Sequence, residues 1–292
     1  MASHLGAERL GPWLRACLRR VVLPAAVRAV GRRDAVRLAG FLSNELRFDG
    51  PNDMRSNGEL LVQDCVVRNA RGRMTVLDVG ANVGDWTLAF AAKADAVGRV
   101  DYTIHAFEPS STTARLLNDR LAGQPCAARV VVHEFGMSSS PGVVTFHIVG
   151  EGLGVNSVHR PLGDPVIHTE QVKMATLDHF AADEHLGYLT LVKVDTEGHD
   201  LSVIVGAHDL LERGAIAVMQ FEYNQRWIAS RTYLRDVFEA APRRYRIGKI
   251  TRKGIEWYAR WHTELESYRE NNYLLCRDDV ADWFPAVPWW KE

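Results

Sequence analysis

Residues 76–87 read Val-Leu-Asp-Val-Gly-Ala-Asn-Val-Gly-Asp-Trp-Thr, and this stretch decides the fold class. Val76–Val79 is a short apolar run, as expected of a buried parallel strand. Gly80, Asn82 and Gly84 follow it and turn the chain into a helix. Glycine suits such a turn because it tolerates positive φ and lets a ligand approach the backbone. The stretch therefore predicts a strand, a ligand-binding turn and a helix in succession.

An acidic residue ends the next expected strand. Residues 102–107 are predicted to form that strand, and Glu108-Pro109 follows it. A carboxylate at this position suits a bidentate hydrogen bond to the two hydroxyls of a ribose. The alternative is that Glu108 caps the helix that starts at Ser110 or Ser111. The order of strand, glycine loop, helix, strand and acid favours the ribose.

The wider chain alternates strands and helices, which predicts a doubly wound, mostly parallel seven-stranded α/β sheet with helices on both faces. Ligands of such sheets gather at the carboxyl ends of the strands. The expected strands are 75–79, 102–107, 129–135, 188–195, 215–222, 244–250 and 272–276, and the expected helices are 85–94, 110–122, 177–185, 198–212 and 230–240. Two extra strands, 143–149 and 166–175, flank a loop at 150–163 that we interpret as a wall of the acceptor pocket or as an exposed hairpin.

Acidic residues follow two further strands. Residues 189–194 run into Asp195-Thr196-Glu197-Gly198-His199-Asp200, and residues 217–221 end at Glu222. We expect Asp195 and Glu222 to project into one crevice, where they could hold a magnesium ion or provide a general base. His199 is another candidate base, whereas Glu197 and Asp200 could simply cap the following helix. Magnesium is not favoured, because the sequence offers no identifiable third ligand, so we predict no metal site.

The N-terminal 47 residues are predicted to form a basic helical extension before the main domain, residues 48–292. Residues 1–44 hold eight Arg and two acids, and Pro24 is expected to end the first helix. Such a helix can pack on the domain, act as a lid, form a homodimer contact or lie on an anionic membrane. Its apolar stripe comprises Leu10, Trp13, Leu14, Cys17, Leu18, Val21 and Val22.

Composition limits the class of protein. The length of 292 residues suits one large α/β domain, and the net charge of −1 gives no general attraction to nucleic acid. The four Cys are scattered, which fits a reduced, cytoplasmic chain and argues against structural zinc. No apolar run reaches the ~18 residues that span a bilayer.

The pattern Asp78-x-Gly80-x-Asn82-x-Gly84 resembles the nucleotide-binding loop of class I S-adenosylmethionine methyltransferases. It differs from the G-x-G-x-x-G fingerprint of dinucleotide-binding oxidoreductases, which argues against that class. Together, five blocks resemble the FkbM family of methyltransferases over roughly residues 48–276: 76–84, Ala106-Phe-Glu-Pro109, Thr176-Leu-Asp178, Lys193-Val-Asp-Thr-Glu-Gly-His199 and Phe221-Glu222.

The resemblance implies methyl transfer from S-adenosylmethionine to a hydroxyl of a natural product or of a sugar in a glycan or glycolipid. Transfer to nitrogen and a non-catalytic cofactor-binding subunit remain the alternatives. The implied catalytic residues are Asp195, Glu197, His199 and Glu222. The implied cofactor-binding residues are Asp78, Gly80, Ala81, Asn82, Gly84, Trp86, Thr87, Glu108, Pro109, Gly136, Met137 and Asp195.

Overall fold

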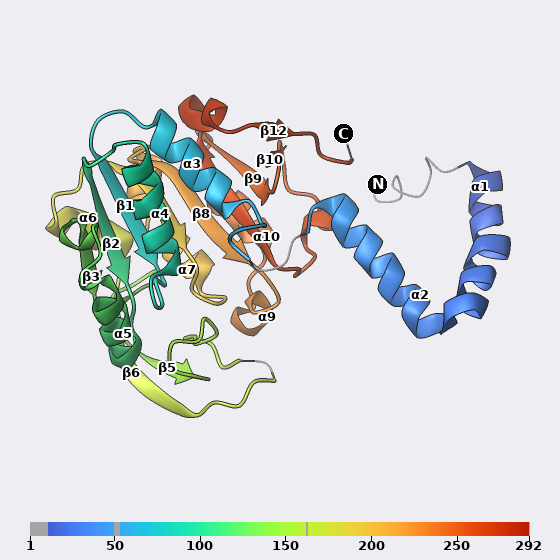
Figure 1. Cartoon of the computed structure of the whole chain (residues 1–292), viewed down its shortest axis with the longest axis horizontal. Coiled ribbons are helices and arrows are strands. Elements are labelled where there is room, and N and C mark those ends of the chain that lie inside the picture. Colours follow the sequence, from blue (N-terminus) through green and yellow to red (C-terminus); the bar gives the residue numbers. More distant parts are fainter. Residues whose placement is uncertain (1–10, 50–52, 162, 292) are drawn as a thin grey trace.

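A twisted nine-stranded sheet forms the centre of the protein in a computed structural model that describes residues 11–49, 53–161 and 163–291 (Figure 1). The strand order is β12-β10-β9-β11-β8-β7-β1-β2-β3. These strands are β1 (Met74–Val79), β2 (Tyr102–Phe107), β3 (Val130–His133), β7 (Leu189–Val194), β8 (Ile216–Tyr223), β9 (Tyr245–Thr251), β10 (Gly254–Tyr258), β11 (Asn271–Arg277) and β12 (Ala286–Val287).

All seven predicted strands lie in this sheet, which β10 and β12 extend to nine. Strands β3, β2, β1, β7 and β8 run parallel, and β11 is antiparallel to both β8 and β9. Trp257, Trp261, Leu265 and Tyr268 have helical spacing in the sequence but do not share a helix. Trp257 lies in β10, Leu265 lies in the short 3-10 helix η3 (Thr263–Leu265), and Trp261 and Tyr268 lie in the connections.

Helices cover both faces of the sheet and enclose two apolar cores. One core packs α3, α4, α5 and the 3-10 helix η4 against β1 and β2, and the other packs α6, α7, α8 and α10 against β7 and β8. The bounds are α3 (Glu59–Asn69), α4 (Asp85–Ala96), α5 (Ser111–Leu121), α6 (Leu177–Asp183), α7 (Asp200–Val205), α8 (His208–Glu212), α9 (Trp227–Ser230), α10 (Leu234–Ala240), η2 (Ala127–Arg129) and η4 (Asp278–Trp283).

Two predicted helices are each interrupted. The helix expected over 198–212 is divided into α7 and α8 at Gly206, where a Cβ would lie 2.0 Å from the Ser138 carbonyl oxygen. The helix expected over 230–240 is preceded by the separate turn α9, which ends at Arg231 in a left-handed conformation. Both breaks follow from tertiary contacts and local turns that an apolar periodicity does not register.

A second, three-stranded sheet lies beyond the carboxyl edge of the main sheet (Figure 1). It contains β4 (Gly136–Met137), β5 (Gly142–Ile148) and β6 (His168–Ala175) in the order β4-β6-β5. Strands β5 and β6 pair antiparallel from Gly142–Met174 to Ile148–His168, so the two extra strands predicted from the sequence are confirmed. This hairpin carries the loop 150–163 across the site described below.

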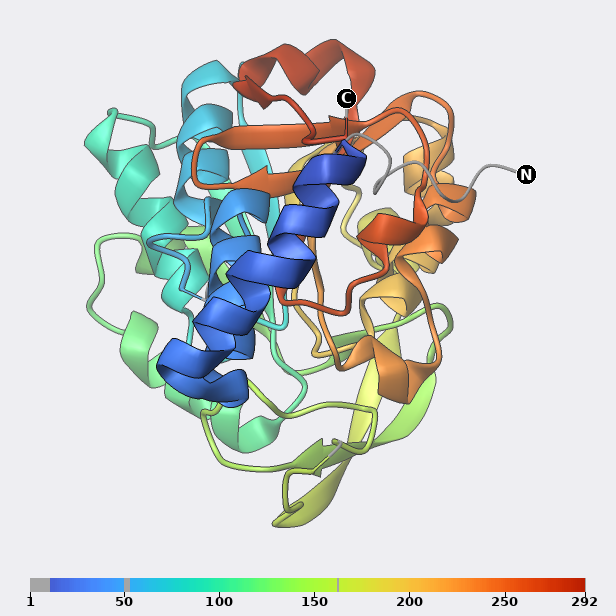
Figure 2. The ribbon, with the colours of Figure 1, turned by 90° about the vertical axis from the view of Figure 1, so that its right-hand side faces the viewer.

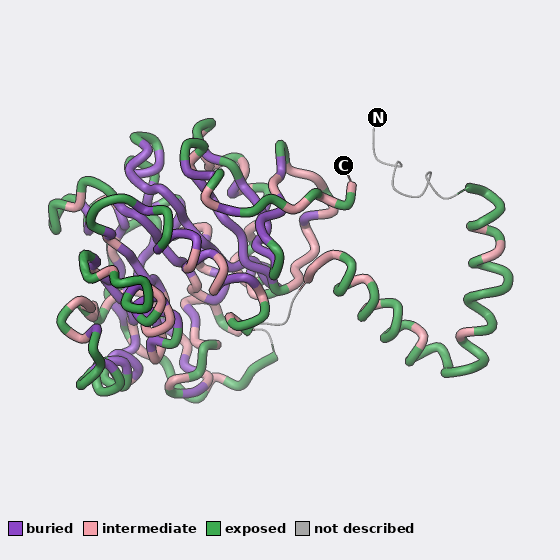
Figure 3. The backbone as a smooth tube through the Cα atoms, turned by 45° about the horizontal axis from the view of Figure 1, so that its top comes forward, coloured by how far each residue is buried: buried purple, intermediate pink, exposed green. Residues whose placement is uncertain are grey.

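The N-terminal helices α1 (Pro12–Cys17), η1 (Leu18–Val22, π-helical) and α2 (Leu23–Arg47) lead away from the domain and bury no residue (Figures 1 and 3). Pro24 does not end the helix, because it lies in the first turn of α2, where no amide donor is needed. The bend falls instead at Gly31, with φ 81° and ψ 158°.

Beyond the last turn of α2, this extension therefore does not pack on the domain core. Leu10 of the expected apolar stripe lies outside the described residues. Within the described chain, no helix combines the length and the apolar character that crossing a bilayer requires.

Candidate active site

A cavity of about 460 Å³ lies at the carboxyl ends of β1, β2 and β7, next to the point where the winding of the sheet reverses. This is where doubly wound sheets bind their ligands. Its walls come from the glycine loop, the ends of β2 and β7, the segment 53–55 and the hairpin loop. The lining residues are Asp53, Met54, Arg55, Glu59, Val79, Gly80, Ala81, Asn82, Val83, Asp85, Trp86, Glu108, Pro109, Gly136, Met137, Phe146, Leu153, Gly154, Asn156, Val158, Met174, Lys193, Asp195, Thr196, Glu197 and His199.

The glycine loop follows β1 and is forced close to β7. Gly80 has φ 83°, and a Cβ there would lie 1.9 Å from the Asp195 carbonyl oxygen. Gly84 has φ 85°, and a Cβ there would lie 2.5 Å from Leu117 Cδ1. Only glycine fits the first position, because both the φ value and the neighbouring backbone exclude a side chain. Gly80, Ala81 and Asn82 all line the cavity, whereas Gly84 does not.

Asp78 and Thr87, which were expected to contact the cofactor, do not line the cavity and are completely buried behind its wall. The Thr87 hydroxyl donates to Asp78 Oδ2 at 2.6 Å. Asp78 is completely buried, and Lys193 Nζ lies 3.8 Å from its other oxygen. Burial raises the pKa of Asp78, while Lys193 and Thr87 oppose that rise. Through Thr87 and Lys193, Asp78 links β1 to α4 and to β7, and these contacts hold the glycine loop in place.

Glu108 lies at the tip of β2 and is 6% exposed. The Ser110 amide donates to its Oε1 and the Asn82 amide donates to its Oε2, each at 3.0 Å. Glu108 therefore links the glycine loop to the turn before α5, although it does not cap the first turn of that helix. Burial raises the pKa of Glu108 to about 7, although the two amides act in the opposite direction.

Three buried polar atoms of the cavity lack both a hydrogen-bond and an ion-pair partner among the described residues. Thr196 Oγ1 lies at the end of β7, whereas the other two, Asn82 Oδ1 and Trp86 Nε1, lie in the glycine loop and at the start of α4. Both residues line the cavity, and Trp86 is only 5% exposed. A buried polar atom without a partner is costly unless a ligand or water satisfies it. Asn82 Oδ1, which accepts hydrogen bonds, and Trp86 Nε1, which donates them, therefore suit a polar ligand that lies along the glycine loop.

The hairpin loop closes the cavity from the opposite side. A Cβ on Gly154 would lie 3.5 Å from Asn82 Nδ2 and 4.0 Å from Glu197 Oε1. The Ser157 hydroxyl donates to the Glu197 carbonyl oxygen at 2.8 Å and fastens the loop to the end of β7. Leu153, Gly154 and Asn156 line the cavity, so the loop is a wall and not a hairpin that lies free in solvent.

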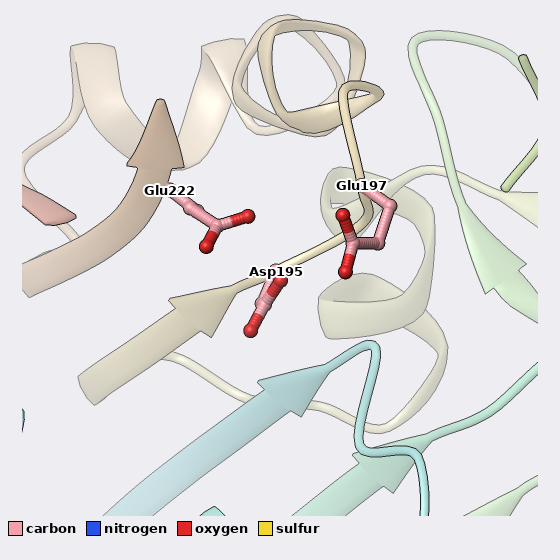
Figure 4. Close-up of side chains that lie close together, drawn as sticks. All are labelled: Asp195, Glu197 and Glu222. Atoms are coloured by element: carbon pink, nitrogen blue, oxygen red, sulfur yellow. The ribbon is translucent and has the colours of Figure 1, made fainter. Parts of the chain in front are cut away.

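Three carboxylates converge at the ends of the neighbouring strands β7 and β8 (Figure 4). One oxygen from each of Asp195, Glu197 and Glu222 lies within 4.8 Å of the others. The predicted convergence of Asp195 and Glu222 is thus confirmed, and Glu197 is the third member. Asp195 and Glu197 line the cavity, whereas Glu222 is 2% exposed and does not.

Each carboxylate of this cluster already contacts a polar or charged neighbour. Lys193 Nζ donates to Asp195 Oδ2 at 2.9 Å, Arg226 Nε pairs with Glu197 Oε2, and Asn224 Nδ2 donates to Glu222 Oε2 at 2.6 Å. The cluster has enough oxygens for a divalent cation, but the cation would compete with these three partners.

Burial and mutual repulsion set the proton affinities of the cluster. Burial, then the charge of Asp195, raises the pKa of Glu197 to about 9, and the same two causes raise the pKa of Glu222 well above its usual range. Burial alone would lower the pKa of Lys193, but Asp195, Asp78 and Glu59 outweigh it and raise that pKa. Lys193 therefore stays positively charged, and the cluster readily holds a proton.

His199 lines the cavity with both ring nitrogens engaged. Its Nε2 lies 2.9 Å from Ser138 Oγ, and its Nδ1 lies 3.2 Å from His159 Nε2. Burial, then the neighbouring His159, lowers the pKa of His199 to about 4. The ring is therefore neutral at pH 7 and connects the cavity with the hairpin loop.

A second, smaller cavity of about 110 Å³ shares one residue with the first. Glu197 lines both, so the Glu197–Arg226 pair lies between them. Most residues that line the second cavity are of polar or charged types, and the lining residues are Ser157, His159, Arg160, Pro161, Asp164, Glu197, Gln225, Arg226, Ile228 and Ala229. Residues of the loop 150–163 and of the segment 223–233 thus meet here, whereas the segment 251–270 lines neither cavity.

Two buried charged residues that line the first cavity were not among the predicted site residues. Glu59, at the start of α3, accepts from Gln220 Nε2 and from Asn57 Nδ2, both at 2.7 Å, and burial raises its pKa. Lys193 is 5% exposed and lies near the carboxyl end of β7. The sequence did contain a signal for Lys193: a lysine within an apolar strand is expected to be a buried cation, and a buried cation needs carboxylate partners.

Comparison with known proteins gives the site a context. The methyltransferase FkbM domain family matches residues 78–247, which is more than half of the chain and includes the glycine loop, Glu108 and the carboxylate cluster. The chain belongs to the FkbM methyltransferase family. As an FkbM methyltransferase it has the Rossmann-like class I methyltransferase fold, with a large, mostly parallel sheet between helices.

Several known proteins resemble this FkbM methyltransferase. The hexuronic acid methyltransferase AglP of Haloferax volcanii is 27% identical over 158 residues, which are 53% of this chain and 59% of AglP. The match therefore spans less than two thirds of AglP. The FkbM methyltransferase of Methylobacillus flagellatus KT has a TM-score of 0.43 and 16% identity, covering 71% of this chain and 45% of that one. Cofactor-bound Rv0187 from MTB has a TM-score of 0.44 and 17% identity, covering 88% and 96%.

Proposed function

We propose that this protein transfers a methyl group from S-adenosylmethionine to a hydroxyl of a sugar, within a glycan, a glycolipid or a glycosylated natural product. The observation that carries the proposal is the arrangement of the main cavity, in which a glycine loop and Glu108 face a carboxylate cluster. Its volume lies in the range of about 300–1,000 Å³ that is typical of small-molecule sites.

The residues of the cavity fit the cofactor. Glu108 offers carboxylate oxygens for the two ribose hydroxyls, and the backbone at Gly80 allows close approach. Asn82 Oδ1 and Trp86 Nε1 would gain the partners that they lack. We assign the adenine edge to Gly136 and Met137, beside Pro109. When bound, S-adenosylmethionine supplies an already activated methyl group, so the protein has to position the acceptor and remove its proton.

Asp195 is the best-placed group for that proton. Its side chain is 33% exposed and lines the main cavity, whereas Glu222 is buried behind it. The charged Lys193 orients Asp195 from the sheet. Glu197 and Glu222 have raised pKa values, so near neutral pH they already hold protons and cannot take the proton of the acceptor hydroxyl.

The second cavity supports a sugar as the acceptor. It adjoins the carboxylate cluster through Glu197 and presents side chains of Ser157, His159 and Arg160. Such groups hydrogen-bond hydroxyl-rich ligands better than apolar ones. The relative AglP, whose name gives hexuronic acid as its substrate class, also favours a sugar acceptor.

An assay with labelled cofactor tests the function. Purified full-length protein is incubated with methyl-labelled S-adenosylmethionine and glycosides, including hexuronic acid glycosides, and products are identified by mass spectrometry and NMR. We expect label on a sugar hydroxyl oxygen. Label on nitrogen would support the N-methyltransferase alternative, and cofactor binding without transfer to any acceptor would support the non-catalytic subunit.

Metal removal should leave the activity unchanged. Each carboxylate of the cluster has a protein partner, so we expect no requirement for magnesium. Rates measured in excess EDTA and in excess magnesium should agree within twofold, roughly the scatter of such assays. Loss of activity in EDTA that added magnesium restores would identify Asp195, Glu197 and Glu222 as metal ligands.

Cofactor binding should weaken as the pH falls through neutrality. The pKa of Glu108 is about 7, and only its ionised form can accept from both ribose hydroxyls. Below this pKa the Kd for S-adenosylhomocysteine should rise by up to about tenfold per pH unit, and above it the Kd should be flat. Isothermal titration calorimetry from about pH 6 to about pH 8.5, on both sides of the pKa, measures this change in Kd.

The matched variant is Glu108→Gln, which keeps the size of the side chain but cannot ionise. Its Kd should be higher than that of the wild-type protein at pH 8 and independent of pH. A wild-type Kd that does not change with pH would remove Glu108 from the ribose site.

A further inference from the structure

Two helical arms project from the domain. The first arm comprises residues 12–30 and the second comprises residues 32–46, and they meet at the bend of Gly31 (Figures 1 and 2). None of their residues is buried. Helices that face water on all sides usually carry polar side chains throughout, because exposed apolar surface is unfavourable.

The arms are instead rich in exposed apolar side chains. They hold thirteen of the 25 exposed large apolar residues in the described chain, although they form only about an eighth of it. Exposed apolar surface so concentrated usually marks a docking site. The thirteen residues are Trp13, Leu14, Leu18, Val21, Val22, Leu23, Val27, Val30, Val36, Leu38, Phe41, Leu42 and Leu46.

The positive charge of the protein is concentrated in the same segment. Residues 11–42 contain seven Arg and one Asp, whereas residues 43–292 contain 27 Lys and Arg against 34 Asp and Glu. In the second arm, Leu38, Leu42 and Leu46 repeat every four residues, while Arg33 and Arg37 form a separate row with the same spacing. Basic amphipathic helices of this kind bind anionic lipid surfaces.

The base of the arms is fixed to the domain by hydrogen bonds and ion pairs. Lys249 Nζ donates to the Arg47 carbonyl oxygen at 2.6 Å, and Arg47 donates to the Glu264 carbonyl oxygen at 2.9 Å. Arg269 contacts both Asn44 and Asp49. The segment 53–55, which lines the main cavity, follows the end of α2 within a few residues.

We propose that the two arms bind the surface of a bilayer that contains anionic lipids. The apolar side chains enter the boundary between headgroups and acyl chains, and the arginines contact lipid phosphates and other anionic headgroups. A second copy of the chain fits less well. Its acidic domain could pair with the arginines but would leave the apolar side chains uncovered, and two sets of arms would repel each other.

Vesicle co-sedimentation of the full-length protein tests this proposal. Vesicles of phosphatidylcholine are compared with vesicles of phosphatidylcholine and phosphatidylglycerol, at low and at high salt. We expect sedimentation with the anionic vesicles only, and less of it at high salt. The double substitution Leu38→Asp/Phe41→Asp should abolish binding. Each of Arg32→Gln and Arg33→Gln should weaken it roughly fivefold.

A matched control and a folding control make the result decisive. Val100→Asp changes an apolar residue that is 69% exposed on the domain, and it should leave vesicle binding unchanged. All variants should keep the wild-type circular dichroism spectrum. No binding to anionic vesicles would overturn the proposal, and so would equal binding by Leu38→Asp/Phe41→Asp. A dimer in solution that this double substitution dissociates, without any vesicle binding, would identify a second copy as the partner.

Discussion

Gly80→Ala should destabilise the protein and abolish cofactor binding. A Cβ at this position would overlap the Asp195 carbonyl oxygen, 1.9 Å away, and the backbone φ of 83° is itself unfavourable for alanine. Because the neighbouring atom belongs to the backbone, the loop and the end of β7 have to move apart. Strain and overpacking together should cost about 2–4 kcal/mol of unfolding free energy. Thermal unfolding followed by circular dichroism and cofactor titration measure both effects.

Gly72→Ala is the matched control for this prediction. Gly72 has a similar φ of 68°, but a Cβ there would have no atom within 4 Å. This variant should lose only about 1 kcal/mol and bind the cofactor normally. Equal melting temperatures for the two variants would show that the contact between the glycine loop and β7 is not needed for stability.

Asp195→Asn should reduce kcat by about 10²–10⁴-fold, the usual contribution of a general base. Asparagine has almost the same shape and still accepts a hydrogen bond from Lys193, but it cannot take a proton. Cofactor affinity should change by less than about tenfold, since a lost hydrogen bond costs ~1 kcal/mol. Single-turnover rates with the identified acceptor and calorimetry with S-adenosylhomocysteine separate the two quantities.

Asp64→Asn provides the control for a lost carboxylate. Asp64 pairs with Arg68 on the exposed side of α3, so kcat should not change. If Asp195→Asn keeps most of its activity while Glu197→Gln loses it, the proton acceptor is Glu197 and not Asp195.

The parallel half of the sheet and the glycine loop could be predicted from the sequence because local patterns specify them. Apolar runs such as 76–79 mark buried strands, and the glycines mark the turn. The strand β10 was not among the strands predicted from the sequence. The bend at Gly31 and the break at Gly206 depend on backbone torsions and on contacts with residues distant in the sequence.

The site was only partly predictable for a similar reason. Asp195, Glu197 and Glu108 follow strands, so their place at the carboxyl edge could be inferred from the strand pattern. Asp78 and Thr87 belong to the glycine-loop segment but face Lys193 and each other, and only side-chain directions reveal this. Glu59 depends on Gln220, which is 161 residues away, so no local pattern could place it in the cavity.

The two cavities are built from different parts of the chain and meet at a single ion pair, Glu197–Arg226. The main cavity is formed largely by β1, β2 and the loops that follow them, whereas the outer wall of the smaller cavity is formed by residues of the segments 157–164 and 225–229. Ser157, His159 and Arg226 contact Glu197 or His199 of the main cavity, but the remaining outer residues can be exchanged without disturbing it. A related enzyme could thus acquire a new acceptor by substitution in two short surface segments, and an engineered library for altered selectivity should concentrate its diversity there.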